Sequence, residues 1–165
     1  MKKLFFIIQL LIAVIPALMA QGSEKPVNSR PINNVSVNFL GDASIISFNY
    51  ERQILITENY IGSSKIGLGY NEEFCLFCSS AEQYITIPHH LTANLGANRH
   101  FFEIGFGGTY FYGNTTRPYV FYPIVGYRLL PLKSNKISFR IFGQYPLAET
   151  DIIFIPVGLN LGFSF

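Results

Sequence analysis

Apolar and polar residues alternate along most of this chain, and the longest run of alternation lies at its carboxyl end. Between residues 151 and 165 every second side chain is apolar: Ile153, Ile155, Val157, Leu159, Leu161, Phe163 and Phe165. The positions between them are mostly small or polar. A period of two is typical of a β-strand whose two faces meet different environments. The pattern predicts one strand of about fourteen residues, although strands usually have about 5–6.

The same alternation recurs in seven earlier segments, each followed by residues that form turns. We expect strands at residues 35–39, 44–53, 60–70, 84–96, 100–112, 119–130 and 136–144. Eight strands with regularly spaced turns are typical of an up-and-down antiparallel barrel. The sequence therefore predicts an all-β, eight-stranded antiparallel β-barrel over residues 34–165, closed by pairing of the last strand with the first. Gly41 and Asp42 are expected to form a very short turn at the end opposite the termini.

The apolar face of each predicted strand is expected to point out of the barrel, because the opposite face would make a poor surface in water. That opposite face combines glycines with the charged residues Glu51, Lys65, Glu103, Arg128 and Arg140. Small side chains and charges of both signs suit the narrow polar lumen of a membrane barrel. Aromatic residues also gather near the segment ends, as in the girdles of such barrels: Tyr60, Tyr70, Tyr84, Tyr110, Tyr112, Tyr119, Tyr127, Phe163 and Phe165. The predicted fold is therefore a transmembrane β-barrel.

The first residues have the pattern of an export signal. Lys2 and Lys3 precede an apolar run over residues 4–15, and Ala20 ends a plausible cleavage site. Residues 1–20 are predicted to be a secretory signal peptide that is cleaved, and the polar residues 21–33 a flexible periplasmic leader. No later stretch approaches the ~20 unbroken apolar residues of a spanning helix. We therefore expect the mature chain in the cell outer membrane, with both termini on the periplasmic side.

Composition agrees with a surface that does not face water. Charged residues make up 13% of the chain, about half of the ~25% that is usual in soluble domains. Aromatic residues make up 16%, with sixteen Phe and ten Tyr. Without Lys2 and Lys3 the chain carries ten basic and ten acidic side chains. A net charge near zero excludes the basic surface that nucleic-acid binding requires.

Several short motifs resemble those of small outer-membrane β-barrel proteins of Gram-negative bacteria, a family that is mostly uncharacterised. They are Leu91, Asn94 and residues 47–52 (SFNYER), 87–88 (IP), 100–107 (HFFEIGFG), 126–128 (GYR), 139–140 (FR) and 162–165 (GFSF). The resemblance implies an eight-stranded barrel of OmpA- or OmpX-like size without known catalytic residues, and we expect a monomer. It also implies that Phe163 and Phe165 form a signal for the barrel-assembly machinery, and that outer-membrane lipids are partners. His89 departs from the pattern, since its outward position is normally apolar.

The five inward charges are the first candidate for a functional site. A closed eight-stranded barrel leaves room only for side chains, and buried charges without partners are strongly destabilising. Glu103 is expected to meet Arg128 or Arg140, and Glu51 to join them near the periplasmic end. The favoured interpretation is a structural plug that fills the lumen. The alternative is a narrow pore for ions or small solutes, gated by rearrangement of these pairs.

The two cysteines, Cys75 and Cys78, lie in the longest predicted loop, residues 71–82. Disulfides persist outside the cytoplasm, so a local disulfide within this loop is the leading interpretation. A redox site would need a thioredoxin-like unit around the cysteines. A metal site would need further ligands, for which only Glu72, Glu73 and Glu82 are near in sequence. We expect neither a metal nor another cofactor.

The three histidines raise the question of catalysis, because some eight-stranded barrels modify lipid A. Alternation places His89 outward, His90 inward and His100 at the periplasmic edge. No set of nucleophile, base and acid therefore gathers on one face. We expect a protein that is not an enzyme, with a structural or surface-interaction role through its extracellular loops. Lipid A modification remains a third and less favoured alternative, and the sequence identifies no extracellular partner.

Overall fold

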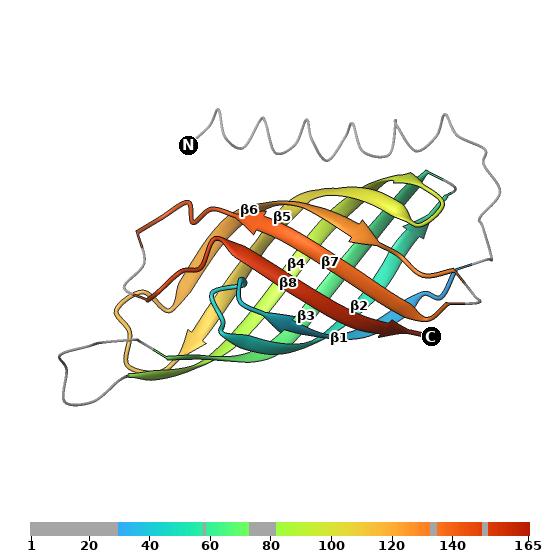
Figure 1. Ribbon diagram of the computed structural model, residues 1–165. Coiled ribbons are helices and arrows are strands. Elements are labelled where there is room, and N and C mark those ends of the chain that lie inside the picture. The colour runs from blue at the N-terminus through green and yellow to red at the C-terminus, as the bar shows by residue number, and fades with distance from the viewer. Residues whose placement is uncertain (1–29, 58, 73–81, 133–134, 150–151) are drawn as a thin grey trace, which may run out of the picture.

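Eight antiparallel strands form a closed barrel in the computed structural model, which describes residues 30–57, 59–72, 82–132, 135–149 and 152–165 (Figure 1). The strands are β1 (Asn33–Phe39), β2 (Ile46–Ile56), β3 (Tyr60–Glu72), β4 (Gln83–Ala97), β5 (His100–Tyr112), β6 (Tyr119–Leu129), β7 (Ile137–Gln144) and β8 (Val157–Ser164). Each strand pairs with its neighbours in sequence, and β8 pairs with β1. This arrangement confirms the predicted eight-stranded antiparallel barrel.

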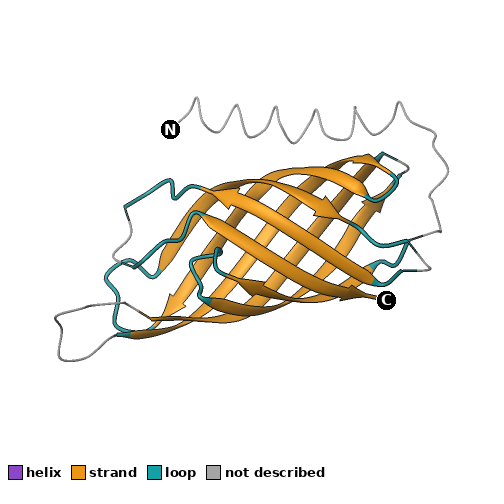
Figure 2. Ribbon diagram, in the orientation of Figure 1, coloured by secondary structure: helices purple, strands orange, loops and turns teal. Residues whose placement is uncertain are grey.

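The strands run obliquely around the barrel wall, and loops join them at its two ends (Figure 2). The loop end carries the connections after β1, β3, β5 and β7. The terminus end carries the start of β1, the last residues of β8 and the connections after β2, β4 and β6 (Figure 1). Among the residues that the structure describes, no helix is long and apolar enough to cross a membrane. The predicted signal peptide, most of the predicted leader, Cys75 and Cys78 lie outside the described residues.

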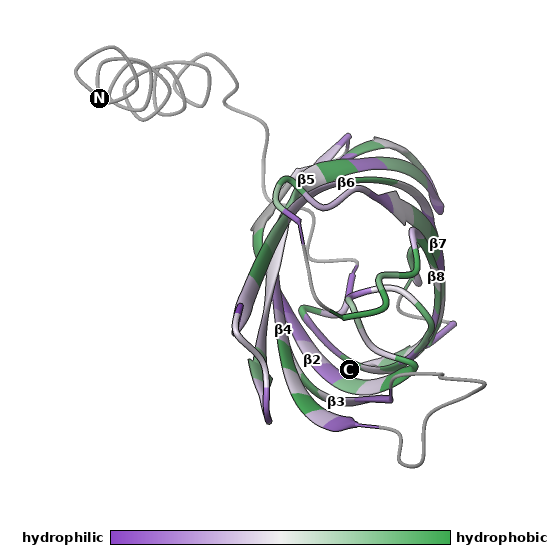
Figure 3. Ribbon diagram, turned by 90° about the vertical axis from the view of Figure 1, so that its left-hand side faces the viewer, coloured by the Kyte–Doolittle hydropathy of each residue, from purple (hydrophilic) through white to green (hydrophobic). Residues whose placement is uncertain are grey.

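Burial alternates along the strands with the period seen in the sequence. In β8, Gly158, Asn160, Gly162 and Ser164 are buried, while the residues between them are exposed. The same alternation of hydrophobic and hydrophilic positions follows the other strands (Figure 3). The apolar face points outward, as the sequence predicts, and the polar face lines the lumen.

The last strand is shorter than predicted. The sequence suggests a strand over most of residues 151–165, whereas β8 begins only at Val157. Its pairing with β1 ends at Phe39 and Leu159, and its pairing with β7 ends at Gly143 and Val157. Residues 152–156 therefore have no pair of neighbouring strands to join. Phe154 instead packs against the apolar residues inside the barrel, because burial there removes an aromatic ring from solvent.

The other strands differ from the predicted ranges by a few residues at most, and β5 has the predicted bounds. The largest difference is in β2, which ends at Ile56 rather than at residue 53 and begins at Ile46 rather than at residue 44. Ser44 and Ile45 belong to the β1–β2 connection. This connection contributes directly to the site inside the lumen.

Candidate functional site

The five predicted lumen charges all point inward and are buried. Their side chains come from five different strands, β2, β3, β5, β6 and β7, and belong to Glu51, Lys65, Glu103, Arg128 and Arg140. None of these residues is more than 4% exposed. Four of them contact one another, whereas Lys65 pairs with a residue that the sequence analysis did not select.

Glu51, Glu103, Arg128 and Arg140 form one ion-pair network across the lumen. Arg128 Nη2 donates to Glu51 Oε2 at 2.6 Å, and Arg128 Nη1 lies 3.5 Å from Glu103 Oε1. Arg140 Nε donates to Glu103 Oε2 at 2.5 Å. The sequence suggested that Glu103 would meet one arginine or the other. In the structure Glu103 contacts both, and Glu51 joins through Arg128.

This network compensates a repulsion that the strand register creates. Arg128 on β6 and Arg140 on β7 are directly opposite each other in the register, and like charges in that position destabilise a sheet. Glu103 lies one strand further along the wall and reaches both guanidinium groups. Arg128 Nη1 also donates to Ser63 Oγ at 3.2 Å. Both guanidinium groups are therefore held by side chains of the barrel wall.

The β1–β2 connection, residues 40–45, turns into the lumen and is named the inner turn here. Four successive residues have positive φ: Leu40 (62°), Gly41 (71°), Asp42 (55°) and Ala43 (51°). This left-handed conformation costs a residue other than glycine about 1–2 kcal/mol. The sequence predicts a very short turn of Gly41 and Asp42 at the end opposite the termini, with Ser44 in a strand. The turn does lie at that end, but it spans residues 40–45, so the predicted length and the placement of Ser44 are wrong. The turn enters the barrel because the lumen wall supplies partners for its backbone and side chains.

Three hydrogen bonds from the barrel wall hold the inner turn. Thr109 Oγ1 donates to Asp42 O at 2.7 Å, and Asn71 Nδ2 donates to Ala43 O at 2.9 Å. The Ser44 and Thr86 hydroxyl oxygens are 2.6 Å apart. These contacts come from β3, β4 and β5, so the turn is fastened to three strands. Their combined effect offsets the unfavourable backbone conformation.

Asp42 is the carboxylate that the sequence analysis missed. Lys65 Nζ donates to Asp42 Oδ2 at 2.5 Å, His90 Nε2 lies 2.8 Å from Asp42 Oδ1, and the amide of Asn38 donates to Asp42. An aspartate beside a glycine is usual in an exposed turn, which conceals this role. A signal was nevertheless present in the charge count. The five predicted lumen residues have three positive and two negative charges, and Asp42 supplies the third negative charge.

His90 connects the inner turn to the ion-pair network. Its Nδ1 lies 3.3 Å from Arg140 Nη2, and its Nε2 lies 3.2 Å from the Tyr122 hydroxyl. The Tyr122 hydroxyl is also 2.8 Å from Thr109 Oγ1. These contacts form a continuous chain from Thr109 through Tyr122 and His90 to Arg140, and all four side chains are buried. The arrangement neutralises charge and holds the turn in place.

The other two histidines are placed differently. His89 is on the outer face, where its Nε2 lies 2.9 Å from the Tyr119 hydroxyl. His100 is at the terminus end beside the Tyr127 hydroxyl. The three histidines therefore share no site. Within the described ranges, no three His, Cys, Asp or Glu side chains are grouped so that they could hold a metal ion.

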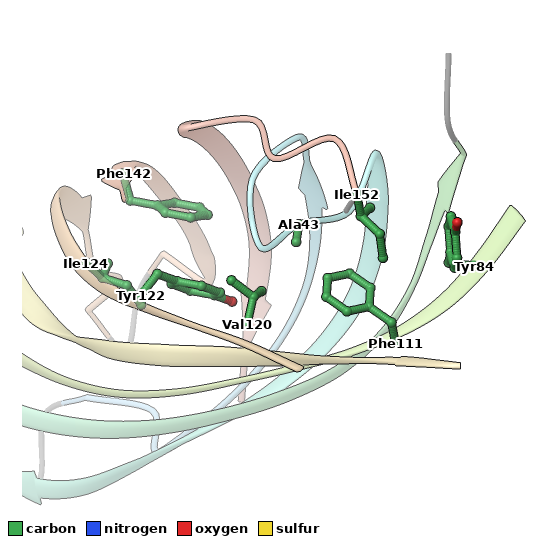
Figure 4. Packing of buried hydrophobic residues seen from close by; sticks show 8 residues of the cluster. All are labelled: Ala43, Tyr84, Phe111, Val120, Tyr122, Ile124, Phe142 and Ile152. Atoms are coloured by element: carbon green, nitrogen blue, oxygen red, sulfur yellow. The ribbon is translucent and has the colours of Figure 1, made fainter. Parts of the chain in front are cut away.

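Apolar residues cover the charged region from both ends of the barrel. The larger cluster lies toward the loop end (Figure 4) and consists of Ala43, Tyr84, Phe111, Val120, Tyr122, Ile124, Phe142 and Ile152. At the terminus end, Ile61, Phe101 and Leu130 form a smaller cluster, and the Arg30 guanidinium lies 5.0 Å from the centre of the Phe101 ring. Charges between two apolar layers interact strongly, because little water screens them.

The two carboxyl-terminal phenylalanines lie at the terminus end and are exposed. Phe165 exchanges two backbone hydrogen bonds with Asn33, from Phe165 N to Asn33 O at 2.9 Å and from Asn33 N to Phe165 O at 3.2 Å. Lys136 Nζ lies 5.5 Å from the centre of the Phe163 ring. The end of β8 is therefore paired with β1, while the rings of Phe163 and Phe165 are exposed on the outside of the barrel.

Comparison of the chain with protein-family models, with curated proteins and with solved structures finds no match. What the barrel does must therefore be inferred from its own geometry.

Proposed function

We propose that this protein is an integral outer-membrane β-barrel whose lumen is plugged by its own side chains, and that it acts structurally or through contacts made by its extracellular loops. One observation carries the proposal: the barrel is apolar outside and charged inside. On the outer face Phe48 is 65% exposed and Leu91 62%, while Glu103 in the lumen is fully buried. A continuous apolar wall is unfavourable in water and favourable in hydrocarbon.

The closed wall supports the same proposal. Every strand has two partners, because β8 pairs with β1 over residues that include Val37 and Leu161. A barrel without a free edge can satisfy its backbone hydrogen bonds in lipid, where no water is available. Exposed tyrosines near the strand ends, among them Tyr112 and Tyr127, suit the two membrane surfaces.

The contents of the lumen favour a plug over a pore. A permeating ion would have to separate Arg128 from Glu51 and Arg140 from Glu103, and it would have to displace the inner turn. Removing one partner of a buried ion pair typically costs 3–5 kcal/mol. An opening that breaks several pairs is therefore strongly unfavourable. The lumen stabilises the wall rather than providing a path.

We further propose that the loop end is extracellular and that the terminus end is periplasmic, following export by a cleaved signal peptide over residues 1–20. At the loop end the β7–β8 connection, residues 145–156, is the longest and the β3–β4 connection, residues 73–82, is the next longest. The β3–β4 connection is the main candidate for surface contacts. Two other loops at this end are joined by Arg117 and Glu149, whose Nη1 and Oε2 atoms are 3.4 Å apart. Such exposed pairs contribute little to stability, so this surface remains free to contact a partner.

The test uses protein refolded from urea into detergent and into liposomes. The folded barrel should migrate faster than the boiled protein on a gel, and it should float with liposomes in a density gradient. In planar bilayers it should produce no single-channel steps. Absence of both the gel shift and the flotation would overturn the membrane proposal. Stable steps that change in Glu103→Gln would instead establish a pore.

A further inference from the structure

An open groove runs over β1 on the outer face of the barrel and has a volume of about 850 Å³. β1 lies between β8 and β2 (Figure 1). The floor of the groove is formed by two small outward side chains of β1, Val35 and Val37. Its sides are formed by the larger residues opposite them in the register, which are Phe48 and Tyr50 on β2 and Leu161 and Phe163 on β8. The groove therefore follows from the difference in side-chain size between β1 and its two neighbours.

The charged residues outside the lumen are separated between the two ends of the barrel. In the described part of the terminus end there is no acidic side chain, and the basic ones are Arg30, Arg52, Arg99 and Lys136. The described part of the loop end has the opposite balance, with Glu72, Glu82 and Glu149 against Arg117. The side chains of the terminus end therefore give it a positive charge.

Two of these basic residues flank the groove at the terminus end. Arg52 is exposed and is the next outward residue of β2 after Tyr50, which lines the groove. Lys136 is also exposed, and its Nζ lies 5.5 Å from the centre of the Phe163 ring on the opposite side. β2 and β8 are two strand spacings apart, which is roughly 10 Å. The two cations therefore stand on either side of one narrow surface.

Neither cation has an anionic partner. Arg52 and Lys136 form no ion pair within the described ranges, and the Arg52 side chain makes no hydrogen bond there. Asn33, opposite Arg52 in the register, accepts from the Tyr50 hydroxyl through Oδ1 at 2.8 Å, which leaves its Nδ2 as a further donor. The carboxyl group of Phe165 lies beside Asn33 but pairs with neither cation. The end of the groove therefore presents positive charge and hydrogen-bond donors.

We propose that the groove binds one anionic phospholipid, with an acyl chain over Val35 and Val37 and the phosphate between Arg52 and Lys136. The inference rests on the membrane location proposed above, because only then does a lipid leaflet face this surface. A guanidinium group can donate two parallel hydrogen bonds to a phosphate, and cations at a membrane surface attract anionic lipids. The apolar floor holds the chain, and the two cations select the negatively charged headgroup.

The two contributions can be removed separately. Arg52→Gln and Lys136→Gln each remove one charge and leave the groove open. Val37→Phe fills the floor and leaves both cations in place, because Val37 is half-buried between the larger side chains of β2 and β8.

Each kind of change has a matched control. Arg99→Gln removes a charge at the same end, but in the turn between β4 and β5, on the other side of the barrel from β1. Val125→Phe enlarges an exposed outward valine on β6. Neither control residue lines the groove.

The experiment measures which lipid the folded barrel retains. Protein in detergent is mixed with equal amounts of phosphatidylglycerol and phosphatidylethanolamine that have the same acyl chains, and is examined by native mass spectrometry. The wild type should retain one phosphatidylglycerol with a preference of about twenty-fold, since each cation near an anionic lipid surface contributes about five-fold. Arg52→Gln and Lys136→Gln should each reduce the preference to about five-fold. Val37→Phe should retain neither lipid, and both controls should behave like the wild type.

Equal retention of the two lipids by the wild type would overturn the proposal. An equal loss of preference in Arg99→Gln would also overturn it, because the attraction would then belong to the whole terminus end. A dimer that Val37→Phe dissociates would assign the groove to a second copy of the chain instead of a lipid.

A readout without substitutions uses phosphatidylglycerol with a photoreactive acyl chain. It should label the tryptic peptides that end at Arg52 and that begin after Arg140, which contain the floor and one side of the groove. Labelling spread over all peptides would contradict a defined site. The gel shift shows whether each variant has folded. Flotation with liposomes tests the membrane location separately, so failure of the groove and failure of the proposed function are distinguishable.

Discussion

Lys65 on β3 and Asp42 in the inner turn are joined by a contact of 2.5 Å between Nζ and Oδ2, and both side chains are buried. This pair links a connection between two strands to the barrel wall. It also places the third negative charge opposite the third positive charge of the lumen. The inner turn is therefore part of the electrostatic balance of the interior, although it lies between strands.

Replacing Asp42 with Asn should destabilise the barrel strongly. The substitution leaves Lys65 buried without a charged partner, and such a loss typically costs about 3–5 kcal/mol. Urea titration of the barrel in liposomes would measure the free energy of unfolding. The double variant Asp42→Asn/Lys65→Met should recover a large part of the loss, because it removes the unpaired charge. A double variant as unstable as the single one would contradict this account.

Glu103→Gln should destabilise the barrel more than Glu51→Gln. Glu103 contacts both arginines, Arg128 and Arg140, whereas Glu51 hydrogen-bonds only to Arg128 among these two. Loss of the Glu103 charge removes the carboxylate that contacts both opposed cations, and the remaining carboxylate, Glu51, contacts only Arg128 of the two. The two variants make the same chemical change and differ only in position. Equal losses in the free energy of unfolding would show that the two carboxylates are equivalent.

Gly41→Ala should reduce stability although the added group is only a methyl. Gly41 has a φ of 71°, and an added Cβ would lie 2.9 Å from the Gly158 Cα and 3.0 Å from the Phe142 ring. Strained backbone and close contact together should cost about 1–3 kcal/mol. Gly143→Ala is the control, since its Cβ has room, and it should change stability by no more than about 0.5 kcal/mol. A similar loss of stability in both variants would contradict the view that Gly41 is needed for the conformation of the inner turn.

Arginine substitutions on the outer face should show directly whether the barrel wall lies in a membrane. Leu91 lies midway along β4 and points outward, while Tyr112 is at the loop end of β5. Leu91→Arg should destabilise the barrel in liposomes by about 2–4 kcal/mol, but Tyr112→Arg by only about 0–1, because the cost falls from the bilayer midplane to the interface. Unfolding titrations of both variants measure this difference. Equal and small effects would indicate that the wall faces water.

The alternation of residues by itself indicated the eight strands and the face that each residue presents, and the short turns between the segments indicated their antiparallel order. A period of two is a local property, and each segment carries it without reference to its neighbours. For the same reason, the inward direction of Glu51, Glu103, Arg128 and Arg140 could be read from position alone. His90 was also placed on the inner face in this way.

Tertiary structure decided where the strands end and which side chains meet. β8 begins at Val157 because β1 and β7 offer no partners beyond that point, although the alternation in the sequence continues. Asp42 enters the lumen because Lys65, His90 and Thr109 converge there from three strands. Such contacts depend on the register between segments far apart in the chain, and no local pattern records that register. The sequence therefore predicted the wall, whereas the inner turn and its ion pairs appear only once the barrel is closed.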